Sequence, residues 1–270
     1  MSTRRRRPNA VSLVRHFVVR GRLRASYWME HMTGWRLFLL WTPRLMSSAL
    51  RGCFKRGFAQ SSIPTGDFVN DFADLPAYYI NLDSRPDRND ETLTEFERLK
   101  LRSPVRYPAA LHSNGGLGCS ISHRNLVQLL LDNGSGLTMI CEDDVEFVFE
   151  GREFSTILKE FQERKHLGVL CLAYRLRGPR LPISRQLSVS NNIQMAACYV
   201  VKPFALRPLL RSFESSVSHL RDGAPYKTFA LDQLWKRVQT REVFFCIPRT
   251  PMARQRRSFS NIALTTKFYG

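Results

Sequence analysis

The sequence predicts an α/β domain whose central sheet is mostly parallel and flanked by helices. Apolar runs of strand length alternate with runs whose apolar residues recur at helical spacing, which is typical of layered α/β proteins. With 270 residues, of which 43% are apolar, the chain can form one sizeable core. One apolar run, Leu137–Cys141, is followed at once by the carboxylates Glu142, Asp143 and Asp144. Because buried carboxylates need partners, this pattern predicts a central strand whose end reaches water or a ligand.

The N-terminal segment, residues 1–57, forms a basic aromatic arm. It contains twelve Arg and one Lys against Glu30, so it carries 13 − 1 = +12 of the net charge of +18. Trp28, Trp35 and Trp41 lie among these charges. The mixture suits an amphipathic segment on an anionic membrane surface. A solvated or disordered basic tail and a nucleic-acid-binding arm are the alternatives, and of these nucleic acid is the less expected partner.

Cysteine usage and hydropathy predict a cytoplasmic protein. The six cysteines include no C-x-x-C pair, which favours free thiols over a disulfide framework or zinc site. No apolar stretch reaches the ~20 residues that span a bilayer, and no secretory signal is evident. We therefore expect a cytoplasmic location, with peripheral contact at the inner face of the membrane through the arm.

A linker, residues 58–75, precedes the main domain, residues 76–262, and a short tail, residues 263–270, follows it. The domain begins with a predicted strand, Ala77–Leu82. The next helix has apolar residues at helical spacing, Pro86 in its first turn and Asp83 or Ser84 as its expected cap.

The middle of the domain repeats this alternation. A predicted turn at 114–118 leads to a helix ending at Asp132, before Asn133 and Gly134. The acidic-tipped strand, a helix and a strand at 169–173 follow.

The C-terminal part begins with a predicted polar loop at 175–190, suited to covering a site. We then expect a strand at 193–201, a helix through Leu209 and Phe213, a helix carrying Asp232 and a last strand at 243–247.

The acidic cluster itself predicts a metal site. In an extended backbone Glu142 and Asp144 point to one face and Asp143 to the other, so alternate carboxylates can meet at one divalent cation. Hard oxygen ligands favour Mn²⁺ or Mg²⁺. The alternative is a set of solvated charges in a loop or at a helix N-terminus.

Three segments in order resemble glycosyltransferase family twenty-five, which includes lipooligosaccharide and procollagen galactosyltransferases. They are Tyr79–Arg88 with an I-N-L strand before Arg, Gly118–His123 with G-C-x-x-S-H, and Ile140–Val145 with E-D-D-V. A further similarity covers Ala197–Val201, Asp232 and the closing stretch from Pro248 through Gln255 to Ile262.

The resemblance implies a GT-A-like, Rossmann-like nucleotide-sugar-binding fold. It also implies metal-dependent inverting transfer of a hexose, with galactose expected, from a UDP-sugar to a glycan or glycolipid hydroxyl, as in lipopolysaccharide biosynthesis. A bound metal would stabilise the charge of the leaving diphosphate. Glu142 and Asp144 are the expected metal ligands, Asp144 also acting in catalysis, and Asp143 is expected to contact the donor.

Inversion needs a base for the acceptor hydroxyl, and Asp232 is the candidate; an exposed helix carboxylate is the alternative. Ser120, Ser122 and His123 are expected near donor phosphate or sugar, although helix capping and a packed imidazole would also explain them.

The end of the first strand supplies the remaining candidate donor-binding residues, which are Asn81, Asp83, Arg85 and Arg88. For the arginines a surface role is the alternative. Arg254, Arg256 and Arg257 could fold over a diphosphate, or form a solvated basic patch.

Two other functions compete with glycosyl transfer. A nucleic-acid-associated, metal-dependent phosphodiesterase would use the acidic cluster for metal and the arm for phosphate, but further ligands for a second metal are scarce. A catalytically degenerate protein would bind the sugar nucleotide without transferring it.

Overall fold

The computed structural model describes residues 69, 71–149, 151–256, 259–260 and 265–266, which include one eight-stranded sheet. Six of its strands run in one direction, and β10 and β8 run in the other. The predicted mostly parallel sheet is therefore confirmed. In sheet order the strands are β2 (Pro104–Pro108), β1 (Ala77–Asn81), β3 (Thr138–Glu142), β10 (Cys198–Val201), β5 (Leu167–Cys171), β11 (Phe244–Pro248), β8 (Leu187–Ser190) and β7 (Arg180–Pro182).

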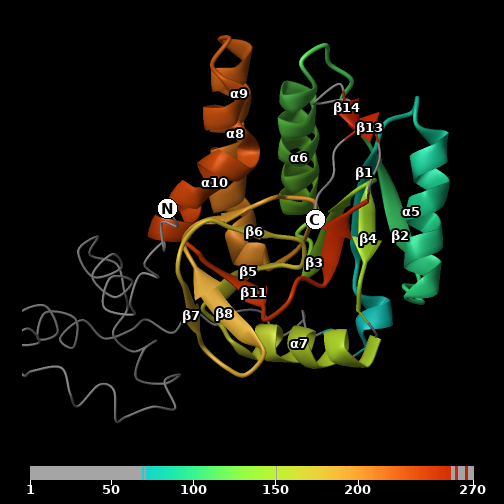
Figure 1. Cartoon of the computed structure of the whole chain (residues 1–270), viewed down its shortest axis with the longest axis vertical. Helices are drawn as coiled ribbons and strands as arrows, with labels where there is room; N and C mark the ends of the chain where they lie inside the picture. The colour runs from blue at the N-terminus through green and yellow to red at the C-terminus, as the bar shows by residue number, and fades with distance from the viewer. Residues whose placement is uncertain (1–68, 70, 150, 257–258, 261–264, 267–270) are drawn as a thin grey trace, which may run out of the picture. The chain divides into compact units, whose positions relative to one another are not determined.

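Helices cover both faces of this sheet (Figure 1). Helices α6, α8 and α10 share one hydrophobic cluster with the sheet, and α5 and α7 share the other. The predicted flanking of the sheet is thus confirmed. The helices are η1 (Phe72–Asp74), α5 (Pro86–Arg98), α6 (Gly115–Asp132), α7 (Gly151–Glu163), α8 (Pro203–Arg221), α9 (Tyr226–Phe229) and α10 (Leu231–Arg241).

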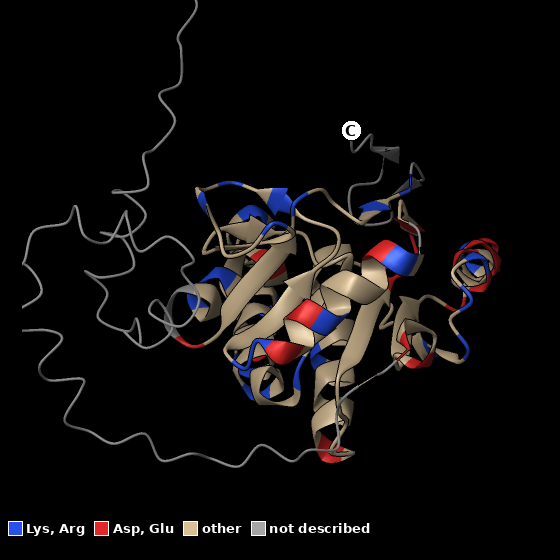
Figure 2. Ribbon diagram, turned by 90° about the horizontal axis from the view of Figure 1, so that it is seen from below, with Lys and Arg blue, Asp and Glu red and all other residues tan. Residues whose placement is uncertain are grey.

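Strand β3 has the double-sided burial that its apolar sequence predicts. Met139 and Cys141 pack on the α5 and α7 face, whereas Ile140 packs on the α6, α8 and α10 face. Figure 2 shows that charged residues are concentrated on helices and connections rather than along the central strands. The alternation carries the next side chain, Glu142, to the α6 side of the sheet.

Two predicted helix starts were wrong. Asp83 and Ser84 do not cap α5; its N-cap residue is Arg85, and Pro86 occupies the first turn. Helix α6 begins within the predicted glycine-rich turn, because the Asn114 side chain accepts a hydrogen bond from the Leu117 amide and caps it. The glycine at 118 permits close packing there, since a Cβ would lie 2.6 Å from the carbonyl oxygen of Ala110.

The predicted loop at 175–190 was also wrong in part. Its last residues form β8, which is buried between β11 and β7, and an earlier piece, β6 (Arg175–Leu176), pairs with β9 (Ile193–Gln194). The single strand predicted at 193–201 is divided into β9 and β10. Met195 lies at the break with φ of 81°, a left-handed conformation that interrupts an extended strand.

Several short strands lacked a sequence signal. Strand β2 contains two prolines, which an edge strand tolerates because it needs fewer ladder donors. The acidic turn leads directly into β4 (Val145–Phe147), which pairs with β12 (Ala253–Gln255). A final pair joins β13 (Phe259–Ser260) to β14 (Thr265–Thr266).

Some sequence-based predictions fall outside the described residues. They include the basic arm, residues 1–57, and most of the linker and tail. Within the described residues no helix has the length and apolar character needed to cross a bilayer. The five described cysteines are free thiols, as the sequence predicts: Cys119, Cys141, Cys171, Cys198 and Cys246.

Candidate functional site

A cavity of about 540 Å³ opens at the carboxyl ends of the parallel strands β1, β2 and β3. This edge is where ligands bind in open α/β sheets, and the volume is within the range of small-molecule sites. Helices α6, α9 and α10 form further walls. The predicted site residues that line the cavity are Arg88, Ser122, His123, Glu142, Asp143, Asp144 and Asp232.

Glu142 and Asp144 converge, as the sequence analysis predicts, although Asp144 lies in a turn rather than an extended strand. The Gln255 side-chain amide donates to both, at 3.4 Å to Glu142 Oε2 and 3.3 Å to Asp144 Oδ2. The other oxygen, Asp144 Oδ1, is buried and has no hydrogen-bond partner among the described residues. A buried carboxylate oxygen without a partner is a strong point of attraction for a cation.

Asp143 lines the same cavity but has partners of its own. Its two carboxylate oxygens accept hydrogen bonds from Arg88 Nη1 at 2.7 Å and Asn81 Nδ2 at 2.9 Å. The Thr92 hydroxyl donates to its backbone carbonyl at 2.8 Å. The side chain is thus neutralised by Arg88 and fixed between β1 and α5, with little capacity left for a ligand.

The proximity of the carboxylates changes their proton affinity. Burial and the negative charge of Glu142 raise the pKa of Asp144 to about 7. Burial also acts to raise the pKa of Glu142, but hydrogen bonds and charges from His123, Cys119 and Arg88 outweigh it and hold that pKa below its usual value. Asp144 is therefore partly protonated near neutral pH beside an ionised Glu142, and a divalent cation bound between them would displace the Asp144 proton.

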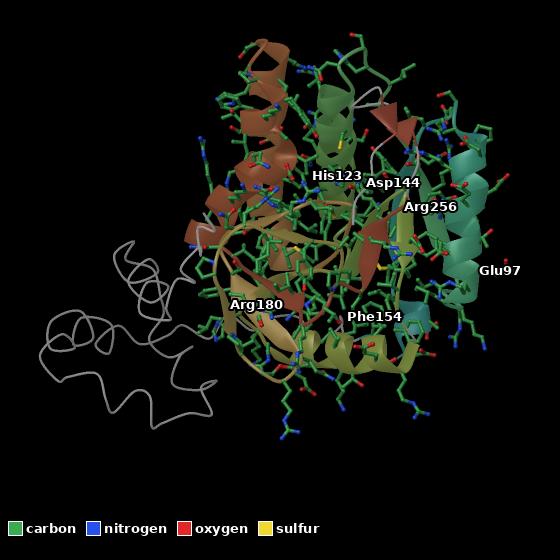
Figure 3. The ribbon with its side chains drawn as sticks, in the orientation of Figure 1. Glu97, His123, Asp144, Phe154, Arg180 and Arg256 are labelled. Atoms are coloured by element: carbon green, nitrogen blue, oxygen red, sulfur yellow. The ribbon has the colours of Figure 1, made fainter. Side chains whose placement is uncertain are left out.

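Helix α6 presents two groups to Glu142 on successive turns. His123 Nε2 lies 3.3 Å from Glu142 Oε1, and the Cys119 thiol lies 3.7 Å from the same oxygen. His123 is fully buried, and its Nδ1 is 3.2 Å from the Tyr199 hydroxyl. Figure 3 labels His123 and Asp144 close together in its view, and both line the cavity. Burial and the charge of Glu142 raise the pKa of the Cys119 thiol well above its usual value.

The two serines of α6 differ in position. Ser122 lines the cavity, and its hydroxyl oxygen accepts a hydrogen bond from the Ala110 amide at 2.8 Å, which fixes the wall after β2. Ser120 points toward α8, where its hydroxyl is 3.0 Å from that of Ser216. Helix packing therefore accounts for Ser120, whereas Ser122 shapes the cavity.

Asp232 lines the cavity from the first turn of α10. It accepts a hydrogen bond from the Met195 amide at 3.0 Å, and burial raises its pKa. The contact holds Met195, another lining residue, in its left-handed conformation. A backbone strained at a cavity wall is a feature of functional sites.

The candidates after β1 form an outer layer. Asn81 is buried and joins Asp143 to Arg106, whose Nε donates to Asn81 Oδ1 at 2.9 Å. Asp83 is mostly exposed and pairs with Arg106 at 2.5 Å. Arg85 pairs with Asp87 at 2.7 Å. These side chains support the cavity from behind rather than lining it.

Basic side chains at the cavity give it the means to hold an anion. Arg88 and Arg256 line it on the α5 side, and Arg175 and Lys227 line it elsewhere. Arg256 forms an ion pair with Glu91, and its backbone amide donates to the Asp144 carbonyl at 2.5 Å. Arg254 pairs instead with Glu146. Arg257 lies outside the described residues.

The donor set fits a hard divalent cation. Glu142 and Asp144 supply carboxylate oxygens on one side of the cavity, Asp144 Oδ1 lacks a partner among described residues, and the pair carries excess negative charge. Mn²⁺ and Mg²⁺ prefer such oxygen donors.

Several lining residues have no individual signal in the sequence. Gln255 lies within the closing stretch and Cys119 within the G-C-x-x-S-H motif, and neither segment marks them as site residues by itself. Met195, Tyr226 and Lys227 gave no signal, because their positions depend on the path of the chain around α9 and α10.

Comparisons with known proteins leave the family open. No family model and no curated sequence matches this chain. Among solved structures it is similar to a glycosyltransferase involved in the glycosylation of the major capsid of PBCV-1, with a TM-score of 0.44 and 9% identity, over 71% of this chain and 96% of that chain. It is also similar to mannose-1-phosphate geranyltransferase from Thermus thermophilus, with a TM-score of 0.32 and 9% identity, over 68% of this chain and 74% of that chain. These TM-scores are below 0.5, so the function has to be inferred from the site.

Proposed function

We propose that this chain is a metal-dependent glycosyltransferase of GT-A type. It would transfer a hexose from a nucleoside-diphosphate sugar to a hydroxyl of a glycan acceptor. The observation that carries the proposal is the convergence of Glu142 and Asp144 at the end of β3, in a cavity that the half-buried carboxylate of Asp232 also lines. The resemblance of the three sequence motifs to family twenty-five supports the same chemistry.

The acidic side of the cavity would hold the diphosphate of the donor. Glu142 and Asp144 would ligate Mn²⁺ or Mg²⁺, which when bound supplies Lewis-acid stabilisation of the leaving diphosphate. Arg88 and Arg256 add positive charge on the same side. Asp143 keeps Arg88 in place through its 2.7 Å ion pair, so we assign it a positioning role.

The nucleoside would occupy the part of the cavity after β1 and β2. Leu82 and Ala109–Leu111 line this part. The Ser122 hydroxyl holds the segment after β2 in place by accepting a hydrogen bond from the Ala110 amide. The largely apolar lining suits a flat base, with the phosphates directed to the acidic tip of β3.

Asp232 is the proposed general base. It faces the cavity from α10, and its raised pKa makes its carboxylate a better proton acceptor than an exposed aspartate. An acceptor hydroxyl between Asp232 and the donor would lose its proton to Asp232 as it attacks the sugar. The adjacent α9 wall, with Tyr226 and Lys227, would orient the acceptor.

The sequence resemblance guides the choice of donor sugar and acceptor. We propose UDP-galactose as donor and a lipooligosaccharide-type glycolipid as acceptor, with residues 1–57 holding the protein at the anionic inner face of the membrane. Flotation with anionic liposomes tests this last part: removal of residues 1–57 should abolish association, and unchanged association would contradict it.

The proposed chemistry is tested by calorimetric titration with UDP-galactose and Mn²⁺. Wild-type protein should bind only when the metal is present, and Asp144→Ala should lose this metal-dependent binding. Asp132→Asn is the matched control, because Asp132 lies at the far end of α6 and does not line the cavity, and it should bind normally. Metal-independent binding, or equal binding by Asp144→Ala, would contradict the assignment.

The same protein samples separate the competing functions. A transferase releases UDP when an acceptor is present, whereas a degenerate binder shows metal-dependent binding without release. A phosphodiesterase would instead cleave a nucleic acid or a generic phosphodiester in the presence of Mn²⁺. A phosphodiesterase of this kind needs a second site for a hard metal ion. Among the described residues, the one group of three metal-ligating side chains contains Glu142 itself, so it does not provide a separate second site.

A further inference from the structure

A cluster of three different metal-ligating side chains lies at the inner end of the cavity. The thiol of Cys119, the imidazole of His123 and the carboxylate of Glu142 place their ligand atoms within 4.8 Å of one another. Cys119 and His123 are four residues apart on α6 and therefore share one face of the helix. Within the described part of the chain this is the one group of at least three such side chains.

The two separations that involve Glu142 match tetrahedral coordination, and all three ligand atoms lie within 4.8 Å of one another. Zinc bonds of about 2.0 Å to nitrogen and oxygen, and about 2.3 Å to sulfur, give edges of roughly 3.3 Å from nitrogen to oxygen and roughly 3.5 Å from sulfur to oxygen. His123 Nε2 lies 3.3 Å from Glu142 Oε1, and Cys119 Sγ lies 3.7 Å from the same atom. An ion bound to all three would thus require little movement of Glu142 relative to α6.

The surroundings of the cluster are those of a metal site. The Tyr199 hydroxyl is 3.2 Å from His123 Nδ1 and can fix the ring with Nε2 toward Glu142. All three side chains line the cavity, so a fourth coordination position is open to water or a ligand. Asp144 and Asp232 line the same cavity and add negative charge.

We propose that Cys119, His123 and Glu142 form a zinc site that is separate in its chemistry from the hard-cation site of Glu142 and Asp144. A thiolate and an imidazole select a borderline-soft ion such as Zn²⁺, whereas carboxylate oxygens select Mn²⁺ or Mg²⁺. Binding releases the thiol proton, so that the thiolate bonds to the metal. Because Glu142 belongs to both sites, zinc there removes a ligand from the hard cation, and the two ions exclude each other.

The zinc site itself does not depend on the proposed transfer reaction, whereas the exclusion of the hard cation does. Titration of the folded chain with Co²⁺, a coloured substitute for zinc, tests the site without any activity measurement. Wild-type protein should develop a thiolate-to-cobalt charge-transfer band and intense tetrahedral visible bands at one equivalent. Zn²⁺ should abolish them, and excess Mg²⁺ should not.

Matched variants identify the ligands. Cys119→Ser should lose the charge-transfer band while circular dichroism shows a folded protein, and Glu142→Gln should weaken binding by roughly tenfold or more. Cys246→Ala, which removes a buried thiol in β11, and Asp144→Asn should keep the band. Absence of the band in wild type, or its persistence in Cys119→Ser, would overturn the proposal.

Whether zinc and the hard cation exclude each other is measured in the UDP-release reaction with Mn²⁺. Zinc should inhibit wild-type protein, and Cys119→Ser should resist this inhibition; equal inhibition of both would overturn the shared-ligand part. If neither protein releases UDP, the transfer function fails, while the cobalt spectra still decide the zinc site.

Discussion

Asp144 should make the stability of the metal-free protein depend on pH in a direction opposite to that of most carboxylates. Its pKa is about 7 in the folded chain, against an ordinary value of 3.8. Because the folded state holds this proton more tightly than the unfolded state, the stability contributed by the neutral form is present at low pH. It is lost as pH rises from about 4 through about 7.

The size of the effect follows from the two pKa values. A difference of roughly 3 pKa units corresponds to roughly 4 kcal/mol between the acidic and alkaline limits. Between pH 5 and pH 8 the loss is about 2.5 kcal/mol, and solvent at the cavity mouth reduces it further. Asp144→Asn removes this titration, since an amide does not ionise. The free energy of unfolding of the variant, relative to that of wild type, should therefore rise by about 1–2.5 kcal/mol as pH rises from 5 to 8.

Urea unfolding at a series of pH values in the presence of a chelator measures the effect. Asp132→Asn serves as the control for removal of one negative charge, and its stability difference from wild type should change little between pH 5 and pH 8. Added Mn²⁺ should abolish the advantage of Asp144→Asn at pH 8, because the cation stabilises the ionised pair. A stability difference between Asp144→Asn and wild type that is constant with pH would refute the paired-carboxylate geometry.

Three further predictions concern other residues. Gln255→Ala removes the amide that lowers the pKa of Asp144, so its free energy of unfolding should continue to fall up to a higher pH than that of wild type in the same urea series; an unchanged profile would contradict the contact. Asp232→Asn should lower the rate of UDP release by more than about a hundredfold, while calorimetry should still detect metal-dependent donor binding. The exposed control Asp222→Asn should remain active. Lys202→Met should lower the free energy of unfolding in urea by about 2–4 kcal/mol, because the ammonium donates to the carbonyls of Phe161, Gln162 and Arg164 at 2.8, 3.1 and 2.9 Å. Lys159→Met, on the exposed side of α7, should change it little, and equal losses would contradict the capping role of Lys202.

Local sequence patterns predicted most elements of the sheet and its helices. The spacing of Phe154, Ile157, Leu158 and Phe161 predicts α7, and all four are buried against the sheet. Such patterns work because a helix or strand must present an apolar face to the core. They fail for β8, whose alternation of apolar residues and serines covers only 4 residues, and whose Ser188 and Ser190 are buried as well as Leu187 and Val189.

The site could be predicted only as far as its residues lie close in sequence. The three carboxylates follow one strand and were identified directly. Gln255 is 111 residues from Asp144, and it reaches the carboxylates because β12 pairs with β4. Likewise, Met195 adopts its left-handed conformation beside Asp232, 37 residues away. Long-range pairings of this kind leave no periodic trace in the sequence.

The division of roles among the three carboxylates follows from charge. Arg88 approaches Asp143 at 2.7 Å, and Asn81 satisfies its second oxygen, so this carboxylate is balanced. Glu142 and Asp144 share only the neutral amide of Gln255 between them, and Asp144 is close to retaining a proton at neutral pH. Because Asp144 Oδ1 has no hydrogen-bond partner among the described residues, this pair is better satisfied by a divalent cation than by a proton, since the cation allows both carboxylates to ionise. The sequence Glu-Asp-Asp thus combines a structural carboxylate with the pair that we propose as cation ligands, and substitution of Asp143 should act through the position of Arg88 rather than through loss of metal.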